Sequence, residues 1–237
     1  MNTILHKANT RGHANHGWLD TNHSFSFAHY YDPNRVNFGV LRVLNDDFVE
    51  GGMGFGTHPH DNMEIISIPL QGDLEHRDSM GNVTLIRQND VQIMSAGKGI
   101  QHSEYNKNKD KKVNFLQIWV FPKEKNITPH YDQKNFDPQK RENKLQLIVS
   151  PEKGSEGVLI NQDARFYLGN LKKGFQTGYA ISQKGNGVYA FVIEGDVTVN
   201  GQKLNKRDGF GIWDTDKISI TADSNSELLL MDVPMNP

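Results

Sequence analysis

The chain has 237 residues, of which 36% are hydrophobic and 23% are charged, a composition typical of a globular protein that can bury a sizeable core. The formal net charge of −2 provides no excess of Lys and Arg for a phosphate backbone, which argues against a nucleic-acid binder. The sequence contains no cysteine, so disulfides and thiolate metal sites are excluded and any metal must be held by His, Asp, Glu or water.

The first half of the chain has the pattern of short strands. Residues 23–31 and 37–45 alternate apolar and polar side chains, and the later apolar runs are bounded by Gly, Asn, Asp or Pro. These later runs lie at 63–72, 83–88, 91–97 and 113–122. The stretch 122–144 is polar and contains three prolines, so we predict a connection between two halves.

Short apolar runs resume after this connection and continue to the end of the chain. They lie at 145–150, 157–162, 164–171, 178–183, 187–204, 209–213, 217–222 and 227–233. Short strands at even spacing predict a sandwich or barrel architecture. The stretch 68–82 also resembles 191–202, which suggests a duplication. In an ungapped match of the two halves, Ile181 and Gln183 stand opposite His58 and His60, so the second copy would have lost its histidines.

Two of the ten histidines stand one residue apart in a stretch that otherwise has a strand pattern. Alternate residues of a strand point to the same face, with Cα atoms about 6.5–7 Å apart, so the rings of His58 and His60 can converge on one ion. Pro59 lies between them and has no N–H for a strand ladder. This predicts a sheet edge or a bulge near the pair.

His102 and Glu104 have the same spacing and follow a glycine-rich turn. If the two pairs lie on neighbouring strands that face inward, they present three imidazoles and one carboxylate. Such a set suits a divalent first-row transition metal and leaves coordination positions for water or substrate. A lone buried histidine is more often a hydrogen-bonded core residue, so it is the second pair that favours a metal site.

The spacing of these residues resembles the two motifs of the cupin family. The matching residues are Gly52, His58, His60, Glu64 and Gly72 in the first motif, and Gly99, His102 and Asn106 in the second. The interval before Gly72 is one residue longer than in the general motif. In the second motif the leading Gly has no match, and Gly97 replaces the usual Pro.

One branch of the cupins is matched more closely. The stretches "RGHANHGWLDTNHSFSFAHYYDPN", "FGTHPHDNMEI", "EHRDSMGN" and "QIMSAGKGIQHSEYN" resemble the pirin family, and in particular its bacterial members with quercetinase activity. Many residues match in the first half, whereas the second half resembles the family only in the general arrangement of its predicted strands.

Pirins are bicupins, so the resemblance implies an all-β fold of two antiparallel β-sandwich (jelly-roll) barrels packed face to face. It implies a metal-binding cupin domain over residues 1–133 and a C-terminal cupin domain without metal ligands over residues 134–237. Carried over residue by residue, the family's metal ligands fall on His58, His60, His102 and Glu104.

Several further residues are weaker candidates. Glu64 carries the carboxylate of the general cupin motif and is our second choice of ligand, with a structural role expected instead. His76 also matches the pirin pattern, and we expect a structural or pocket-rim role for it. The N-terminal histidines have irregular spacings that predict surface or hydrogen-bonding roles; they are His13, His16, His23 and His29.

The implied activity is that of quercetin 2,3-dioxygenase, in which O₂ cleaves the ring of a flavonol and carbon monoxide is released. The implied cofactor is one divalent transition metal, with Fe(II) expected first and Mn, Ni, Cu or Zn as alternatives. Such an ion would act as Lewis acid and template. Glu104 is the predicted catalytic base for the hydroxyl proton of the substrate.

Pirins also include regulatory proteins that act through protein partners, and the same four ligands would serve that role. A roomy apolar cavity beside the ligands would favour the enzyme, whereas a small capped pocket would favour the regulator. For the enzyme we expect a small flavonol-like aromatic substrate and O₂, no direct nucleic-acid partner, no membrane partner and a monomer. Neither a signal-peptide run nor an apolar run of roughly 18 residues is found, which predicts a cytoplasmic location.

Overall fold

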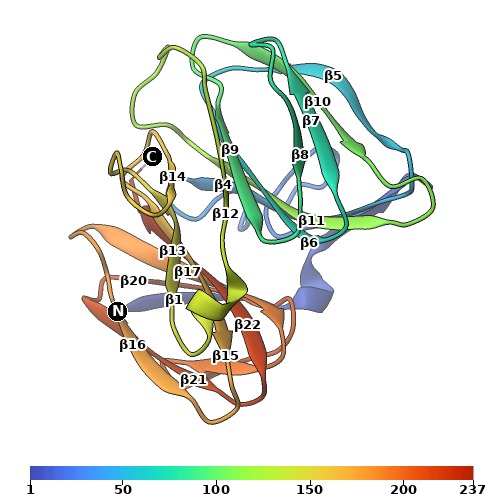
Figure 1. The fold of residues 1–237 in the computed structure, drawn as a ribbon. Helices are drawn as coiled ribbons and strands as arrows, with labels where there is room; N and C mark the ends of the chain where they lie inside the picture. The colour runs from blue at the N-terminus through green and yellow to red at the C-terminus, as the bar shows by residue number, and fades with distance from the viewer. Residues whose placement is uncertain (237) are drawn as a thin grey trace.

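The computed structural model describes residues 1–236, and its regular structure consists of strands and two short 3₁₀ helices, η1 (Ala8–Thr10) and η2 (Pro138–Arg141). The chain forms two lobes, which lie one above the other in Figure 1. The strands of the upper lobe are β2 (Gly12–Asn15), β3 (Leu19–His23), β4 (Leu41–Val49), β5 (Gly54–His60), β6 (Glu64–Gln71), β7 (Leu74–Asp78), β8 (Val83–Ile86), β9 (Asp90–Ser95), β10 (Ile100–Asn106), β11 (Val113–Val120) and β12 (His130–Asn135).

The lower lobe contains the rest of the strands. They are β1 (Asn2–His6), β13 (Gln146–Ser150), β14 (Val158–Leu159), β15 (Arg165–Leu171), β16 (Gln176–Ala180), β17 (Asn186–Glu194), β18 (Val197–Val199), β19 (Gln202–Leu204), β20 (Gly209–Trp213), β21 (Lys217–Ala222) and β22 (Ser226–Pro234). Within residues 1–236, no helix has the length and apolar composition needed to cross a bilayer.

Each lobe pairs a seven-stranded sheet with a four-stranded sheet. In the upper lobe the strand orders are β12-β9-β6-β11-β4-β3-β2 and β5-β10-β7-β8. In the lower lobe they are β1-β20-β17-β22-β15-β13-β14 and β16-β21-β18-β19. The second arrangement repeats the first strand by strand, which supports the duplication suggested by the sequence. The strands β16 and β21, which correspond to β5 and β10, carry no histidine.

Strand β1 crosses from the start of the chain to the lower lobe, and β12 completes the matching edge of the upper lobe. β1 pairs with β20, and β12 pairs with β9. The stretch 122–144 connects the two halves as predicted, and it also contains β12 and η2, which the sequence did not indicate. The division of the chain at residues 133/134 stays a prediction.

The predicted strand at 23–31 was also wrong, because β3 ends at His23 and an irregular segment follows. Phe25 is nevertheless buried, and it packs against His6 and Tyr189 in the core between the lobes. The alternating aromatic pattern reflects this packing of a loop and not the pleat of a strand.

The largest apolar core lies between the two seven-stranded sheets. From the upper lobe it includes residues on one face of β4, β6 and β11, such as Leu44, Ile66 and Ile118. These pack against residues of the lower lobe such as Phe191 and Leu229. Each fully buried side chain of this kind stabilises the fold by about 1.5–3 kcal/mol. Because strand residues alternate between faces, the neighbouring residues of β4, β6 and β11 point into the upper barrel.

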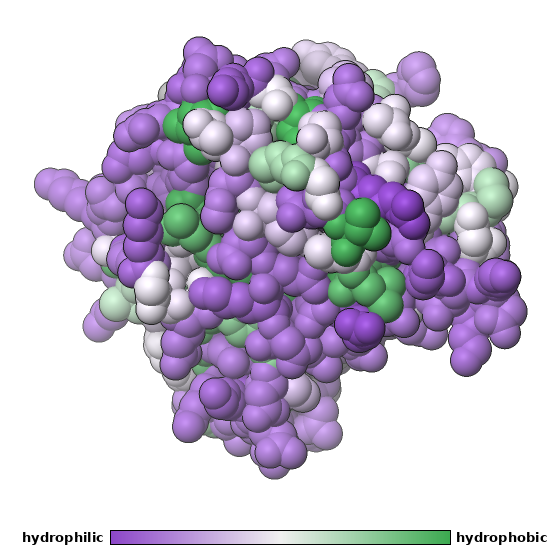
Figure 2. Space-filling model, turned by 45° about the horizontal axis from the view of Figure 1, so that its top comes forward, coloured by the Kyte–Doolittle hydropathy of each residue, from purple (hydrophilic) through white to green (hydrophobic). Residues whose placement is uncertain are grey.

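The outer surface is mostly hydrophilic in the view of Figure 2, where apolar residues form small separate groups. The most exposed large hydrophobic side chains come from separate parts of the chain; they are Met1, Tyr31, Met53, Met80, Val83 and Tyr105. Single exposed hydrophobic residues are normal for a soluble fold and need no separate explanation.

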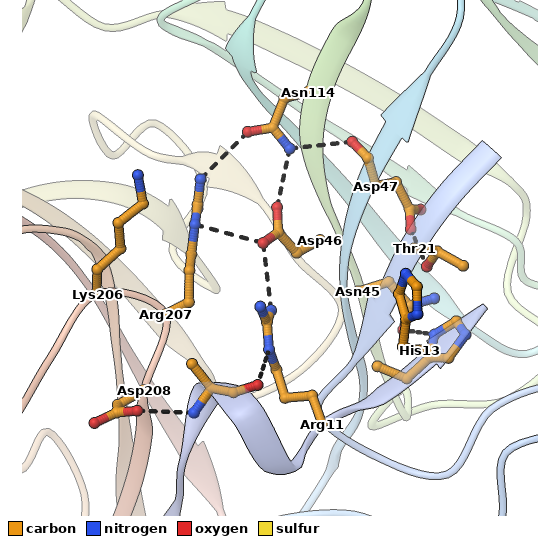
Figure 3. Close-up of polar contacts among 12 residues, drawn as sticks. Arg11, His13, Thr21, Asn45, Asp46, Asp47, Asn114, Lys206, Arg207 and Asp208 are labelled. Carbon is orange, nitrogen blue, oxygen red and sulfur yellow. Dashed lines mark hydrogen bonds and ion pairs between the residues drawn. The ribbon is translucent and has the colours of Figure 1, made fainter. Parts of the chain in front are cut away.

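A buried polar network also connects the lobes (Figure 3). Asp46 on β4 pairs with Arg11 at 3.3 Å and with Arg207 of the lower lobe at 3.4 Å. Asn114 on β11 donates to Asp46 Oδ1 at 2.9 Å and accepts from Arg207 Nη2 at 3.3 Å. One buried carboxylate therefore holds two buried guanidinium groups.

We expect Asp46→Asn to lower the free energy of unfolding by about 3–5 kcal/mol, because both guanidinium groups would remain buried without their counter-charge. Urea denaturation measures the loss. Glu194→Gln is the matched control, since the Glu194–Lys206 pair is about half exposed and exposed pairs contribute about 0–1 kcal/mol. Equal losses in the two variants would contradict this role of Asp46.

His6, in the core between the lobes, makes the stability of the fold depend on pH. Its Nδ1 lies 2.8 Å from the hydroxyl of Tyr189, and burial, followed by the charge of Arg35, lowers its pKa to about 4. The unfolded chain takes up this proton near pH 6.5, so protonation favours the unfolded state, and the stability contributed by His6 is lost as the pH falls from about 6.5 to 4.

We expect His6→Gln to remove about 2–3 kcal/mol of the fall in unfolding free energy between pH 7 and pH 4. Urea titrations at a series of pH values measure this difference. His130 is exposed, and His130→Gln should keep the pH slope of the parent protein. If His6→Gln keeps that slope too, the assigned protonation of His6 is wrong.

Candidate metal centre

Three of the predicted ligands meet inside the upper barrel. β5 pairs with β10, and His58 lies directly opposite His102, while His60 lies opposite Ile100. The ring centroids are 4.4 Å apart for His58 and His102, 4.8 Å for His58 and His60, and 4.9 Å for His60 and His102. One ring nitrogen of each imidazole lies within 4.8 Å of the others, so the three can reach a common ion.

The predicted edge and bulge are both present. β5 is an edge strand of its sheet, and Gly56 and Thr57 stand opposite the single residue Ser103 between two regular pairs. The carbonyl oxygen of Gly56 lies 2.8 Å from Nδ1 of His58, which can donate to it. This hydrogen bond orients the ring and leaves the lone pair on Nε2 for a ligand.

The other two imidazoles are held neutral. Burial, followed by the nearby imidazoles, lowers the pKa of His102 to about 3 and that of His60 to about 4. Neutral imidazoles offer the lone pairs that metal binding requires. His102 is 1% exposed, yet neither of its nitrogens has a hydrogen-bond partner within residues 1–236. Buried polar atoms without partners are costly, and a cation held by His102 would satisfy one of these nitrogens.

Glu104 lies in a second group that shares His102. Its carboxylate, a nitrogen of His76 and a nitrogen of His102 lie within 4.8 Å of one another. Oε2 of Glu104 accepts from the amide of Gln117 at 2.8 Å, and Oε1 lies 3.0 Å from the hydroxyl of Ser67. These bonds hold the carboxylate beside His102, so the structure brings all four predicted ligands into one region.

The two weaker candidates have different surroundings. Glu64 accepts from Ser95 at 2.7 Å and from the backbone N–H of Asn161 in the lower lobe at 3.1 Å, so it links the lobes. His76 is fully buried, with Nε2 3.1 Å from Asp78 Oδ2, and it lies behind His102 at a centroid distance of 5.3 Å. His76 therefore does not lie at the rim of the pocket.

A cavity of about 580 Å³ opens beside this cluster, and His58, His60 and Glu104 line it. Much of the remaining wall is apolar or aromatic; among its residues are Leu19, Phe27, Ala28, Tyr30, Phe55 and Trp119. The volume lies in the range of pockets that enclose small organic ligands. The cavity thus places the imidazoles of His58 and His60 beside a space suited to an aromatic molecule.

The N-terminal histidines have a place that the sequence analysis missed, because all four line this cavity. Two of them also make the expected hydrogen bonds. His13 Nε2 lies 2.8 Å from Asp20, and His23 Nδ1 lies 2.9 Å from Asn45. Their irregular spacings concealed this, because they lie on two strands and two loops. Their number within the first 30 residues was a signal.

Known proteins resemble the chain over nearly its whole length. The sequence model described as pirin matches residues 5–120, and that of the quercetinase C-terminal cupin domain matches residues 147–233. A protein of Escherichia coli K12 named quercetin 2,3-dioxygenase is 49% identical over 97% of this chain and 98% of its own length. A pirin-like protein of Caulobacter vibrioides is 43% identical over 93% of this chain and 95% of its own.

A solved structure shows the same architecture. The crystal structure of the bacterial pirin YhhW from Escherichia coli, in complex with nickel(II), superimposes with a TM-score of 0.93 at 48% identity and covers 98% of this chain and 99% of its own. The two paired barrels are thus the bicupin fold that the sequence predicted. With these similarities over both lobes, the chain belongs to the pirin family.

Proposed function

We propose that this protein is a metal-dependent dioxygenase with quercetin 2,3-dioxygenase activity. The observation that carries the proposal is a cluster of three imidazoles, two of which, His58 and His60, line an aromatic-walled cavity of about 580 Å³. The similarity to the Escherichia coli protein named quercetin 2,3-dioxygenase supports it. A small aromatic substrate and O₂ are the reactants that this activity requires.

A metal ion is the cofactor of this proposal, with His58, His60, His102 and Glu104 as its ligands. The donor set fits, since imidazole nitrogens and one carboxylate suit first-row transition metals. We propose Fe(II) as the native ion and keep Mn, Ni, Cu and Zn as alternatives; the YhhW structure holds nickel(II). When bound, the ion supplies Lewis acidity and a template for substrate and O₂.

The chain's own residues bind the substrate and move its proton. We assign Glu104 as the base that takes the flavonol hydroxyl proton, because each of its oxygens keeps a lone pair beyond the contacts with Ser67 and Gln117. The aromatic side chains of Phe55 and Trp119 line the cavity and offer faces to a planar ring system. The apolar walls exclude water from the reacting centre.

The alternative was a regulatory protein with a small capped pocket. The roomy, largely apolar cavity favours the enzyme. A protein partner, the monomeric state and the cytoplasmic location stay predictions.

The activity is tested by measuring O₂ uptake and carbon monoxide release with quercetin, on protein reconstituted with Fe(II). We expect uptake that depends on the metal and is lost in His58→Ala/His60→Ala, which removes two of the three clustered imidazoles. His130→Ala, an exposed histidine of β12, should keep the activity. Tight stoichiometric metal binding without O₂ uptake would contradict the enzyme and leave the regulatory alternative.

Gln117 should support the metal site through Glu104. We expect Gln117→Leu to weaken metal binding about 10–100-fold, since such hydrogen bonds orient metal ligands. A competition titration with a chelator measures the affinity. Gln92→Leu is the matched control, because Gln92 is buried on the same sheet and its amide makes no hydrogen bond within residues 1–236. Equal affinities of the two variants would argue against ligation by Glu104.

A further inference from the structure

Strand β4 places two polar side chains in the barrel interior, between apolar residues on the same face of the strand. Val43, Asn45, Asp47 and Val49 share one face of the strand, because residues alternate along it, and Asn45 and Asp47 line the cavity. Asp46 lies on the other face and serves the contact between the lobes. In Figure 3 the side chain of Asp47 points away from that network and toward Thr21.

Asp47 has no counter-charge. It is 4% exposed, and no Lys, Arg or His forms an ion pair with it within residues 1–236. Its Oδ1 accepts from the hydroxyl of Thr21, while no protein group of the described chain donates to Oδ2. Burial raises the pKa of Asp47 to about 7. A carboxyl group buried in this way is destabilising, so its presence at a cavity wall points to a ligand.

Two oxygen or amide groups near it already have partners. Asn45 Oδ1 lies 2.9 Å from a ring nitrogen of His23, and the amide of Gln117 donates to Glu104. Oδ2 of Asp47 is therefore an acceptor of the polar wall that remains free for a ligand donor. A phenol fits this site, because it combines an aromatic ring for the walls with a hydroxyl donor for Oδ2.

We propose that Asp47 determines specificity by accepting a hydrogen bond from a phenolic hydroxyl of the substrate, separate from the hydroxyl at the metal. This inference rests on the proposed function and deepens it. The substrate class is then a polyhydroxylated aromatic compound and not any planar aromatic molecule. A site built to bind a hydroxyl group rejects the analogue without it, because the buried acceptor is left unpaired.

Isothermal titration under argon, on Fe(II)-loaded protein, tests this without turnover. The probes are quercetin and 3-hydroxyflavone, which keeps only the hydroxyl on the ring that is cleaved. We expect quercetin to bind about 10–100-fold more tightly than 3-hydroxyflavone, as for one hydrogen bond to a charged group. In Asp47→Leu this preference should disappear through weaker quercetin binding, with 3-hydroxyflavone unchanged within about threefold.

Two further variants control for the shape of the pocket and for folding. Asp47→Asn keeps an acceptor oxygen without the charge and should keep part of the preference, between the parent protein and Asp47→Leu. Asn45→Leu changes the same face of β4 at an oxygen that already has a partner, and it should affect both probes alike. Urea denaturation should show Asp47→Leu to be at least as stable as the parent, because the variant removes a buried carboxyl group without a counter-charge.

Three results would overturn the inference: no preference for quercetin in the parent protein, an equal loss for both probes in Asp47→Leu, or a preference that Asp47→Leu retains. Failure of the proposed function is separate, because it would appear as absent O₂ uptake while these binding affinities remain measurable.

Discussion

The face-to-face packing of the two seven-stranded sheets is the constraint on which the site depends. Leu44, Ile66 and Ile118 must face the lower lobe to form the core between the sheets. Because the side-chain period of a strand is two, their neighbours are then directed into the upper barrel, and a slip of one residue would reverse every assignment. The polar residues at the site are these neighbours: Asn45, Asp47, Ser67 and Gln117.

The two barrels share one topology but differ in what fills their interiors. Apolar side chains fill the lower barrel as a single cluster, while the upper barrel contains two smaller clusters beside its imidazoles and cavity. The side chains that line a cavity lack some of the packing contacts that would otherwise stabilise the fold. The filled lower barrel and the core between the sheets supply apolar packing that the cavity of the upper barrel lacks.

The sequence predicted what depends on local periodicity. The spacing of His58 and His60, the matching spacing of His102 and Glu104, and the edge position near Pro59 all follow from the strand period and the missing proline N–H. The resemblance to pirins added the two barrels. The sequence concealed β12, whose edge position leaves its residues partly exposed on both faces without apolar alternation. It also concealed Asp47, because the cost of burying a carboxyl group becomes visible only when its surroundings are known.

The position of β1 has a consequence for synthesis on the ribosome. Residues 2–6 pair with residues 209–213, so β1 cannot find its place until synthesis has passed β20. The upper barrel takes its strands from β2 to β12 and can close earlier. During that interval the apolar residues Ile4 and Leu5 are without the core they later pack against, and β20, once made, is an open edge until β1 joins it. β1 can therefore join its sheet only after β20 has been made.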